Sequence, residues 1–275
     1  MPSQSANTGA ISRRILVAAA ITVAASFFSS MAAYSQQLRV AAAADLQFAM
    51  KDLAARYERQ SNQKVEIVYG SSGNFSTQIE NGAPFDLFFS ADSSYPAKLI
   101  EHGLADRQSL YRYAIGRLVL WASQDEHLDV AKNGFQVLLD PRVSKIAIAN
   151  PEHAPYGRAA VGALQKAGIY EQVKSKLVYG ENISQAAQFV QSGSAQVGLV
   201  ALSLAVSPAM QSGDRWLIPP DFHPPLEQVA VVISASKNKS EALQFLAFVK
   251  SGEGRELLAK YGFTVPSDSG GEAKP

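Results

Sequence analysis

The chain has 275 residues, of which 47% are hydrophobic, with 25 Lys and Arg against 24 Asp and Glu and no cysteine. This composition is typical of a folded globular protein, and the length allows one large or two medium domains. The near-zero net charge gives no electrostatic reason to expect nucleic acid or an anionic membrane as a partner, and the lack of cysteine excludes disulfides, thiolate nucleophiles and cysteine-ligated metal sites.

The first 35 residues have the pattern of a secretory signal peptide. Arg13 and Arg14 precede an apolar run that ends at Phe28, and small residues continue to Ser35. An uncleaved membrane anchor is the alternative, but a bilayer span needs roughly 18 apolar residues and this Ala- and Ser-rich run is shorter. The paired arginines also match a small part of a twin-arginine signal. A match of two residues is weak, so the pattern favours ordinary export. We predict cleavage near Ser35, which leaves an exported chain with 23 basic and 24 acidic residues.

From residue 38 onward, short β-branched or aromatic runs alternate with stretches whose apolar residues lie three or four apart. This alternation predicts an α/β chain with largely parallel sheets buried between helices. Helices are predicted where Leu46, Leu53 and Tyr57 share a face, near Leu246, and near Leu258. The predicted strands are Leu38–Ala42, Val65–Tyr69, Asp86–Phe89, Arg117–Trp121, Lys145–Ala149, Lys176–Tyr179, Gln196–Ala201, Arg215–Ile218 and Gln228–Ser234.

Nine strands are many for one compact sheet, so domain size favours two α/β lobes. Ligands of open α/β sheets bind where strands end and helices begin, so we expect the ligand between the lobes. The paired prolines Pro219-Pro220 and Pro224-Pro225 bracket a segment that we expect to be an irregular connection. The small polar residues 268–275 are expected to form a frayed tail.

Three loops place small or hydroxyl-bearing residues between a predicted strand and a predicted helix: Ala41–Asp45, Gly70–Asn74 and Asn150–Gly157. The second loop offers two serine hydroxyls and several backbone N–H groups just before a helix. Because the first N–H groups of a helix are unpaired and partly positive, a tetrahedral oxyanion can bind there without any lysine or arginine. An ordinary serine-rich turn with an N-cap is the alternative interpretation of this loop.

A serine hydrolase is a second hypothesis, with His153 acting as base toward Ser71 or Ser72. The loop lacks the final glycine of a G-x-S-x-G elbow, because Asn74 stands at that position. The four histidines show no metal-ligand spacing, and the sequence contains neither a dinucleotide-binding fingerprint nor a phosphate-binding P-loop. No catalytic residue and no cofactor is therefore predicted.

Four segments together carry a resemblance that runs over essentially the whole mature chain. The segments are Val40–Leu46, Gly82–Phe88 with Ser90-Ala91-Asp92, Asn150–Gly157 and Tyr261-Gly262-Phe263. With these motifs the chain resembles the periplasmic molybdate-binding proteins, the solute receptors of molybdate ABC importers. The resemblance implies no enzymatic activity, a periplasmic location, a membrane permease as partner, and molybdate or tungstate held by neutral hydrogen-bond donors. We further expect a monomer.

The resemblance also implies a type II periplasmic-binding fold, in which two crossover strands join the lobes. They are expected near Tyr113–Gly116 and Pro225–Val229. The first lobe would then comprise residues 36–115 and 228–267, and the second lobe residues 116–227.

Carried over residue by residue, the resemblance implies an oxyanion site made of Ala44, Asp45, Ser72, Tyr156 and Ile183. Ser72 matches a serine that gives its hydroxyl and amide, while Tyr156 and Ile183 match amide donors. Two departures stand out: Ala201 replaces a common tyrosine, and Asp45 replaces a common serine. The Tyr156 phenol could supply the hydroxyl missing at residue 201, and packing of that ring against the cleft wall is the alternative.

Asp45 is the less expected of the two departures, because a carboxylate repels a dianion. We expect it to cap the following helix by accepting a hydrogen bond from the Phe48 amide. The leading hypothesis is thus an exported receptor that closes over a tetrahedral oxyanion. Phosphate or sulfate is the competing ligand, since Asp45 could accept a proton from protonated phosphate. A sensor domain that presents its ligand to another protein is a third possibility.

Overall fold

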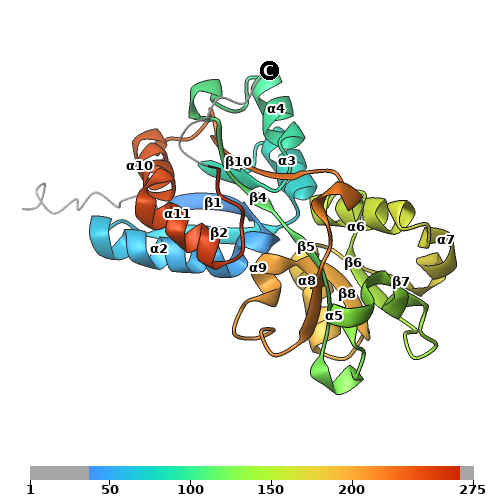
Figure 1. Cartoon of the computed structure of the whole chain (residues 1–275). Helices are drawn as coiled ribbons and strands as arrows, with labels where there is room; N and C mark the ends of the chain where they lie inside the picture. Colours follow the sequence, from blue (N-terminus) through green and yellow to red (C-terminus); the bar gives the residue numbers. More distant parts are fainter. Residues whose placement is uncertain (1–36, 267–275) are drawn as a thin grey trace, which may run out of the picture. The chain divides into compact units, whose positions relative to one another are not determined.

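The computed structural model describes residues 37–266, so the predicted signal peptide and the tail 268–275 lie outside the described residues. The described chain contains two five-stranded mixed sheets, each with its own helices, which form two lobes. Figure 1 shows the first lobe around β1 and β10 and the second lobe around β6 and β8. Between residues 37 and 266, no helix is long and apolar enough to cross a membrane.

The first sheet has the strand order β2-β1-β3-β10-β4, and the second has the order β7-β6-β8-β5-β9. In each sheet, two pairs of neighbouring strands are parallel and two are antiparallel. The strands are β1 (Leu38–Ala43), β2 (Val65–Gly70), β3 (Leu87–Ser90), β4 (Tyr111–Gly116), β5 (Leu118–Ala122), β6 (Ile146–Ala149), β7 (Leu177–Gly180), β8 (Val197–Ala201), β9 (Asp214–Leu217) and β10 (Leu226–Val232).

The helices cover the sheets and begin where strands end. They are α2 (Gln47–Ser61), α3 (Ser72–Glu80), α4 (Ser94–Glu101), α5 (Val130–Asn133), α6 (Pro155–Lys166), α7 (Tyr170–Val173), α8 (Ile183–Gln191), α9 (Leu202–Ala205), α10 (Lys239–Lys250) and α11 (Gly252–Lys260). A short 3-10 helix, η1 (Ala44–Leu46), joins β1 to α2.

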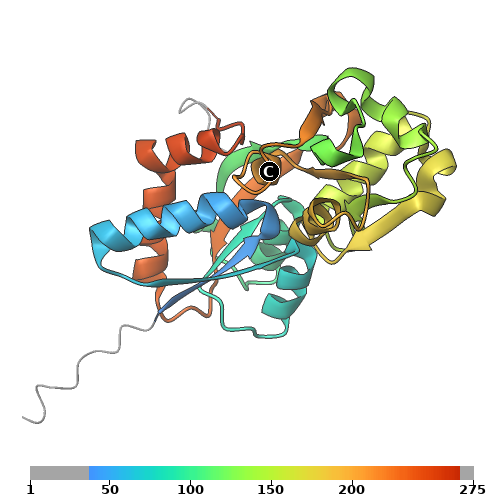
Figure 2. The same ribbon diagram turned by 90° about the horizontal axis from the view of Figure 1, so that it is seen from below.

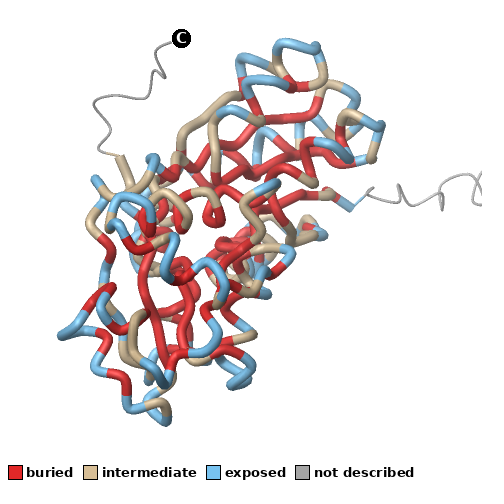
Figure 3. The backbone as a smooth tube through the Cα atoms, turned by 90° about the vertical axis from the view of Figure 1, so that its right-hand side faces the viewer, coloured by how far each residue is buried: buried red, intermediate tan, exposed pale blue. Residues whose placement is uncertain are grey.

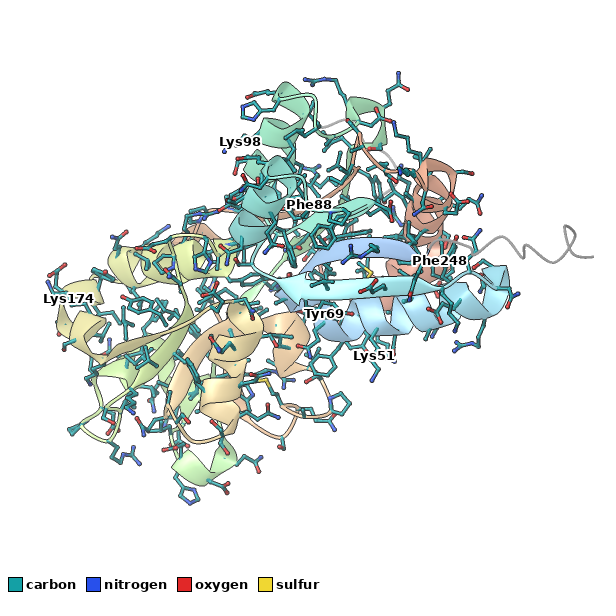
Figure 4. All side chains as sticks on the ribbon, turned by 180° about the vertical axis from the view of Figure 1, so that it is seen from behind. Lys51, Tyr69, Phe88, Lys98, Lys174 and Phe248 are labelled. Atoms are coloured by element: carbon teal, nitrogen blue, oxygen red, sulfur yellow. The ribbon has the colours of Figure 1, made fainter. Side chains whose placement is uncertain are left out.

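Both faces of the first sheet are buried. In β1, Val40 and Ala42 belong to the core under α2, α10 and α11, whereas Ala41 belongs to the core under α3 and α4. The alternation follows from the two-residue repeat of a strand. In β3 the same rule places Phe88 in the α3–α4 core, and Figure 4 shows its ring inside the lobe while Lys98 lies at the outside of α4. Figure 2 shows α2 along one face of this sheet, next to α10 and α11.

The second sheet is buried even more completely, because every residue of β5, β6 and β8 is buried. Figure 3 shows this pattern as continuous buried backbone in the strands and exposed backbone in the outer loops. Such strands appear in the sequence as short continuous apolar runs.

All nine predicted strands are present, with ends that shift by one or two residues. Two expectations need correction. The sheets are mixed rather than largely parallel, since four of the eight strand pairs are antiparallel. The segment Tyr111–Gly116 forms a tenth strand, which the residue pattern did not predict and the resemblance implied as a crossover strand near Tyr113–Gly116. It pairs antiparallel with β10, so the two crossover segments lie against each other at the junction between the sheets.

The chain passes between the sheets twice, at Arg117 between β4 and β5, and at residues 218–225 between β9 and β10. The second passage contains both proline pairs and one 3-10 turn, as an irregular connection should. We propose that these passages are the lobe boundaries. The first lobe then comprises residues 37–116 and 226–266 of the described chain, within about two residues of the division that the sequence suggested.

Candidate anion-binding site

A small cavity lies where the ends of strands from both sheets meet the beginnings of helices. All the site residues suggested by the sequence line it: Ala44, Asp45, Ser72, Tyr156 and Ile183. The centre of a water molecule can occupy about 10 Å³ of this cavity. That is room for about one water molecule. Ala201 is buried at the end of β8 and is not among the lining residues.

Three helices begin at the cavity wall: α3 at Ser72, α6 at Pro155 and α8 at Ile183. Amides in the first turn of a helix have no acceptor within that helix, and the helix dipole makes this end partly positive. The amides of Ser72, Tyr156 and Ile183 stand at such positions. Together these three helix ends form an electropositive wall without a lysine or arginine side chain among the lining residues.

Local sequence explains where these helices begin. Ser71 caps α3 by accepting a hydrogen bond from the Asn74 amide, and Asn182 caps α8 by accepting from Ser184 and Gln185. Helix α6 has proline at its first position, where the missing N–H is not needed.

Gly157 allows the first turn of α6 to lie against the end of β6. A Cβ atom at residue 157 would overlap the carbonyl oxygen of Ala149 and would come within 2.8 Å of the backbone of Asn150. The Pro155-Tyr156-Gly157 sequence therefore sets both the start of α6 and its close approach to the strand.

Ser72 is a completely buried hydroxyl residue on the cavity wall and stands at the first position of α3. Its Oγ accepts a hydrogen bond from the Ala91 amide at 3.0 Å. Because that bond uses an oxygen lone pair, the hydroxyl hydrogen remains available to a ligand. Ser72 can thus offer two donors to one anion, its hydroxyl and its amide.

The structure places Asp45 differently from its expected role as an N-cap. The residue lies within η1, and α2 begins at Gln47 without a side-chain cap. Its Oδ2 atom instead accepts a hydrogen bond from the Tyr156 hydroxyl at 3.1 Å. The N-cap prediction is wrong because a contact between residues 111 positions apart replaces the local one.

Asp45 and Tyr156 are both buried, with exposed fractions of 1% and 2%. Burial raises the pKa of Asp45 to about 7, against smaller opposing effects of the Tyr156 hydroxyl, the Gln228 side-chain amide and the backbone amides of Asp45 and Leu46. Burial and the neighbouring carboxylate raise the pKa of Tyr156 well above its ordinary value. The phenol therefore stays protonated, and in this structure its hydrogen goes to Asp45, so Tyr156 faces the anion site with its amide.

Three polar side chains behind the cavity were not identified from the sequence. The Tyr113 hydroxyl of β4 donates to Gln228 Oε1 of β10 at 2.9 Å, and the Ser203 hydroxyl donates to the carbonyl oxygen of Asp45 at 2.7 Å. All three are buried. Gln228 carried a weak signal, since it is a polar residue directly before the apolar run Val229–Ile233.

The two lobes touch directly at the mouth of the cavity. The Gly73 amide in α3 donates to the carbonyl oxygen of His153 at 2.9 Å, and His153 Nδ1 lies 2.9 Å from Ser71 Oγ. A second group of contacts joins α4 and its loop to α6, where Arg158 donates to Asp92 at 2.5 Å and to the Tyr95 hydroxyl at 2.9 Å. The structure thus represents a closed arrangement of the lobes.

The hydrolase hypothesis can be compared with this geometry. His153 does reach Ser71, but the same Ser71 oxygen caps α3, and the nearest acid, Glu181, is 59% exposed and 3.7 Å from His153 Nε2. Ser72, the other proposed nucleophile, bonds to Ala91 instead. A nucleophile needs a base held by a buried orienting group, and this arrangement lacks one.

The fold defines a class, a two-lobed α/β binding protein, and its candidate ligand site lies at helix N-termini where the two sheets meet. Residues 38–264 match the family described as bacterial extracellular solute-binding protein. The chain belongs to that family of solute-binding proteins.

Named relatives cover nearly all of the described chain. A molybdate-binding protein of Azotobacter vinelandii is 38% identical over 238 residues, which are 84% of this chain and 91% of the relative. A molybdate-binding protein of Rhodobacter capsulatus is 37% identical, over 86% of this chain and 91% of the relative. The solved structure of an Azotobacter vinelandii periplasmic molybdate-binding protein superimposes with a TM-score of 0.79 at 33% identity, and the match covers 84% of this chain and all of that one.

Proposed function

We propose that this protein captures molybdate or tungstate outside the cytoplasm and delivers it to the membrane permease of an ABC importer. The observation that carries the proposal is the meeting of three helix N-termini and the Ser72 hydroxyl at one small cavity. The names of the relatives supply the identity of the anion.

Neutral donors suit a tetrahedral oxyanion. Each helix end presents N–H groups in fixed directions, and several such groups can surround one anion without the strong attraction of a paired lysine or arginine. Under this proposal the amides of Ser72, Tyr156 and Ile183 and the Ser72 hydroxyl bind the anion, while Ala44 and Asp45 complete the wall.

Binding would be coupled to movement of the lobes. The cavity holds about one water molecule in the present arrangement, so a larger tetrahedral oxyanion fits only if the lobes move apart. A ligand that contacts both lobes favours the closed state over the open one, and that difference in affinity drives closure. The closed form is what the permease would recognise.

Phosphate or sulfate is the second candidate ligand, and Asp45 is an observation that favours phosphate, which keeps a proton at neutral pH. Oδ1 of Asp45 has no hydrogen-bond partner within residues 37–266 and could accept a hydrogen from a protonated oxyanion. A fully deprotonated dianion offers no such hydrogen.

Calorimetric titration of the mature protein with molybdate, tungstate, sulfate and phosphate tests the function. We expect molybdate and tungstate to bind much more tightly than the other two anions. Tighter binding of phosphate or sulfate would replace the proposal with the second candidate, and the lack of heat with all four anions would reject an oxyanion receptor.

Replacing Ser72 by alanine removes one donor to the anion. Hydrogen bonds to charged groups contribute roughly 1.5–3 kcal/mol, so we expect about 10- to 150-fold weaker molybdate binding by calorimetry. The change also leaves the buried Ala91 amide without its acceptor, which should lower the free energy of unfolding by about 1–3 kcal/mol. Ser76→Ala is the matched control, because it removes another buried hydroxyl of α3 that does not line the cavity. Equal affinities for the two variants would show that Ser72 does not contact the anion.

Export is expected to remove the first 35 residues. The protein would then act as a monomer outside the cytoplasm, since one chain contains the whole proposed site. N-terminal sequencing of protein recovered from the extracytoplasmic fraction should begin near Gln36, and gel filtration should give the mass of one chain. Full-length protein in the membrane fraction would instead indicate an uncleaved anchor.

A further inference from the structure

Asp45 is a buried acid with no cation beside it. It lines the anion cavity and is 1% exposed, and Oδ2 accepts the Tyr156 hydrogen bond while Oδ1 has no partner in the described chain. None of the ion pairs within residues 37–266 includes it. A buried carboxylate in such a place is costly unless it is neutralised, because burial favours the uncharged form.

The surroundings of Asp45 offer no compensating positive charge. The titratable groups that face it are two phenols, Tyr156 from α6 and Tyr113 from β4, and burial raises the pKa of both. The packed helices α8 and α9 carry no charged residue. On α2, Lys51 is exposed and points outward (Figure 4), and Asp52 accepts a hydrogen bond from the Tyr261 hydroxyl. The charged residue of β2 is Glu66, which pairs with Arg39 at the surface.

A bound dianion would increase this cost. Both the carboxylate and the anion are negative, and they would share one small enclosure with little water to screen them. Protonation of the carboxylate removes the repulsion. It also changes Asp45 from an acceptor into a donor, which is what an oxyanion requires from its site.

We propose that Asp45 takes up one proton from solvent when the anion binds, at the unpartnered Oδ1, and donates that hydrogen to an oxygen of the bound anion. The inference rests on the proposed function, because it needs an oxyanion in this cavity. No proton leaves the anion, and the Tyr156 hydroxyl keeps its hydrogen bond to Oδ2. The raised pKa of the ligand-free protein, about 7, means that uptake near neutral pH requires little free energy.

Proton coupling predicts a specific pH profile. Below a pH of about 7, Asp45 already holds its proton and the affinity should be nearly constant; above that value, the affinity should fall by about tenfold for each pH unit. Molybdate and tungstate keep their double charge across this range, so the change would come from the protein. Asp45→Asn is the matched variant: it preserves the shape, can accept from Tyr156, and places a permanent N–H donor where the acid would place O–H.

The experiment is calorimetric titration with molybdate at pH values of about 6 and about 9, each in two buffers of different ionisation enthalpy. We expect the wild-type protein to bind up to about 100-fold more weakly at the higher pH. Close to one proton should be taken up for each anion at pH about 9, and almost none at pH about 6, where Asp45 already holds its proton. Asp45→Asn should show no proton uptake and similar affinities at both pH values.

Each outcome has a distinct meaning. Tight molybdate binding without pH dependence or proton uptake would overturn the inference and leave the proposed function intact. A pH dependence that persists in Asp45→Asn would assign the proton to another group and also overturn it. No molybdate binding by the wild-type protein at either pH would reject both. If Asp45→Asn does not fold, the proton uptake of the wild-type protein at the higher pH still shows whether a proton binds together with the anion.

Discussion

A Gly73→Ala variant is expected to bind molybdate about 5- to 150-fold more weakly than the unchanged protein, while each lobe stays folded. A Cβ atom at residue 73 would lie 2.6 Å from the carbonyl oxygen of His153 and 3.0 Å from its Cα. Both of these atoms belong to the backbone of the other lobe and cannot rotate away. The Tyr95 hydroxyl oxygen of the same lobe would lie 2.8 Å away, but it is the end of a side chain and can move. Overpacking of this kind costs typically about 1–3 kcal/mol, and the part caused by the His153 backbone falls on the closed state.

The measurements are calorimetric affinity and the midpoint of denaturant unfolding without ligand. Gly252→Ala is the matched control, since Gly252 begins α11 and a Cβ atom there would meet nothing within 4 Å. We expect the control to bind as the wild-type protein does. Full affinity in Gly73→Ala would show that the bound state does not bring α3 against His153, and that the closed arrangement seen here is not the one that holds the anion.

Most strands were predictable because they are short runs of mainly apolar or β-branched residues bounded by turn residues. Their directions were not. A strand that is buried on both faces has the same continuous apolar pattern whether its neighbour is parallel or antiparallel, so β5 and β8 gave no sign of their antiparallel pairing. The residue pattern alone did not reveal β4, because one residue, Arg117, separates it from β5 and no turn signal marks the change of sheet. Only the resemblance implied a crossover strand there.

The part of the candidate site that is formed by backbone N–H groups was predictable from the sequence. Small residues followed by a capped helix start are visible in the sequence, and they led to Ser72 and to the loop before α6. The side-chain partners were not visible, because they join distant positions. Tyr156 reaches Asp45 from 111 residues away, and Tyr113 reaches Gln228 from 115 residues away. From the sequence, a local N-cap was the best explanation of Asp45, because its actual partner, Tyr156, is distant in the chain and the pairing depends on the folded structure.

The same residue gives the second large effect, which needs no ligand. The free energy of unfolding of the wild-type protein, relative to that of Asp45→Asn, is expected to fall by up to about 4 kcal/mol as the pH rises from about 4 to about 7. Burial raises the pKa of Asp45 in the folded state from 3.8 to about 7. Between these values the folded state keeps a proton that the unfolded state has released. Because the folded state binds more protons, raising the pH favours the unfolded state.

Urea denaturation of both proteins at several pH values measures this difference, with the midpoint and slope fitted at each pH. The comparison with Asp45→Asn is needed because other carboxylates act in the opposite direction. Hydrogen bonds from Lys64 and the Val65 amide lower the pKa of Glu58, for example, so that its contribution is lost as the pH falls. Those contributions are common to both proteins and cancel in the difference. A difference that stays constant from acid to neutral pH would mean that Asp45 ionises in the folded protein as readily as in the unfolded chain. The carboxylate would then have access to water or a cation at the cavity, and a proton would not be needed to admit a second negative charge beside it.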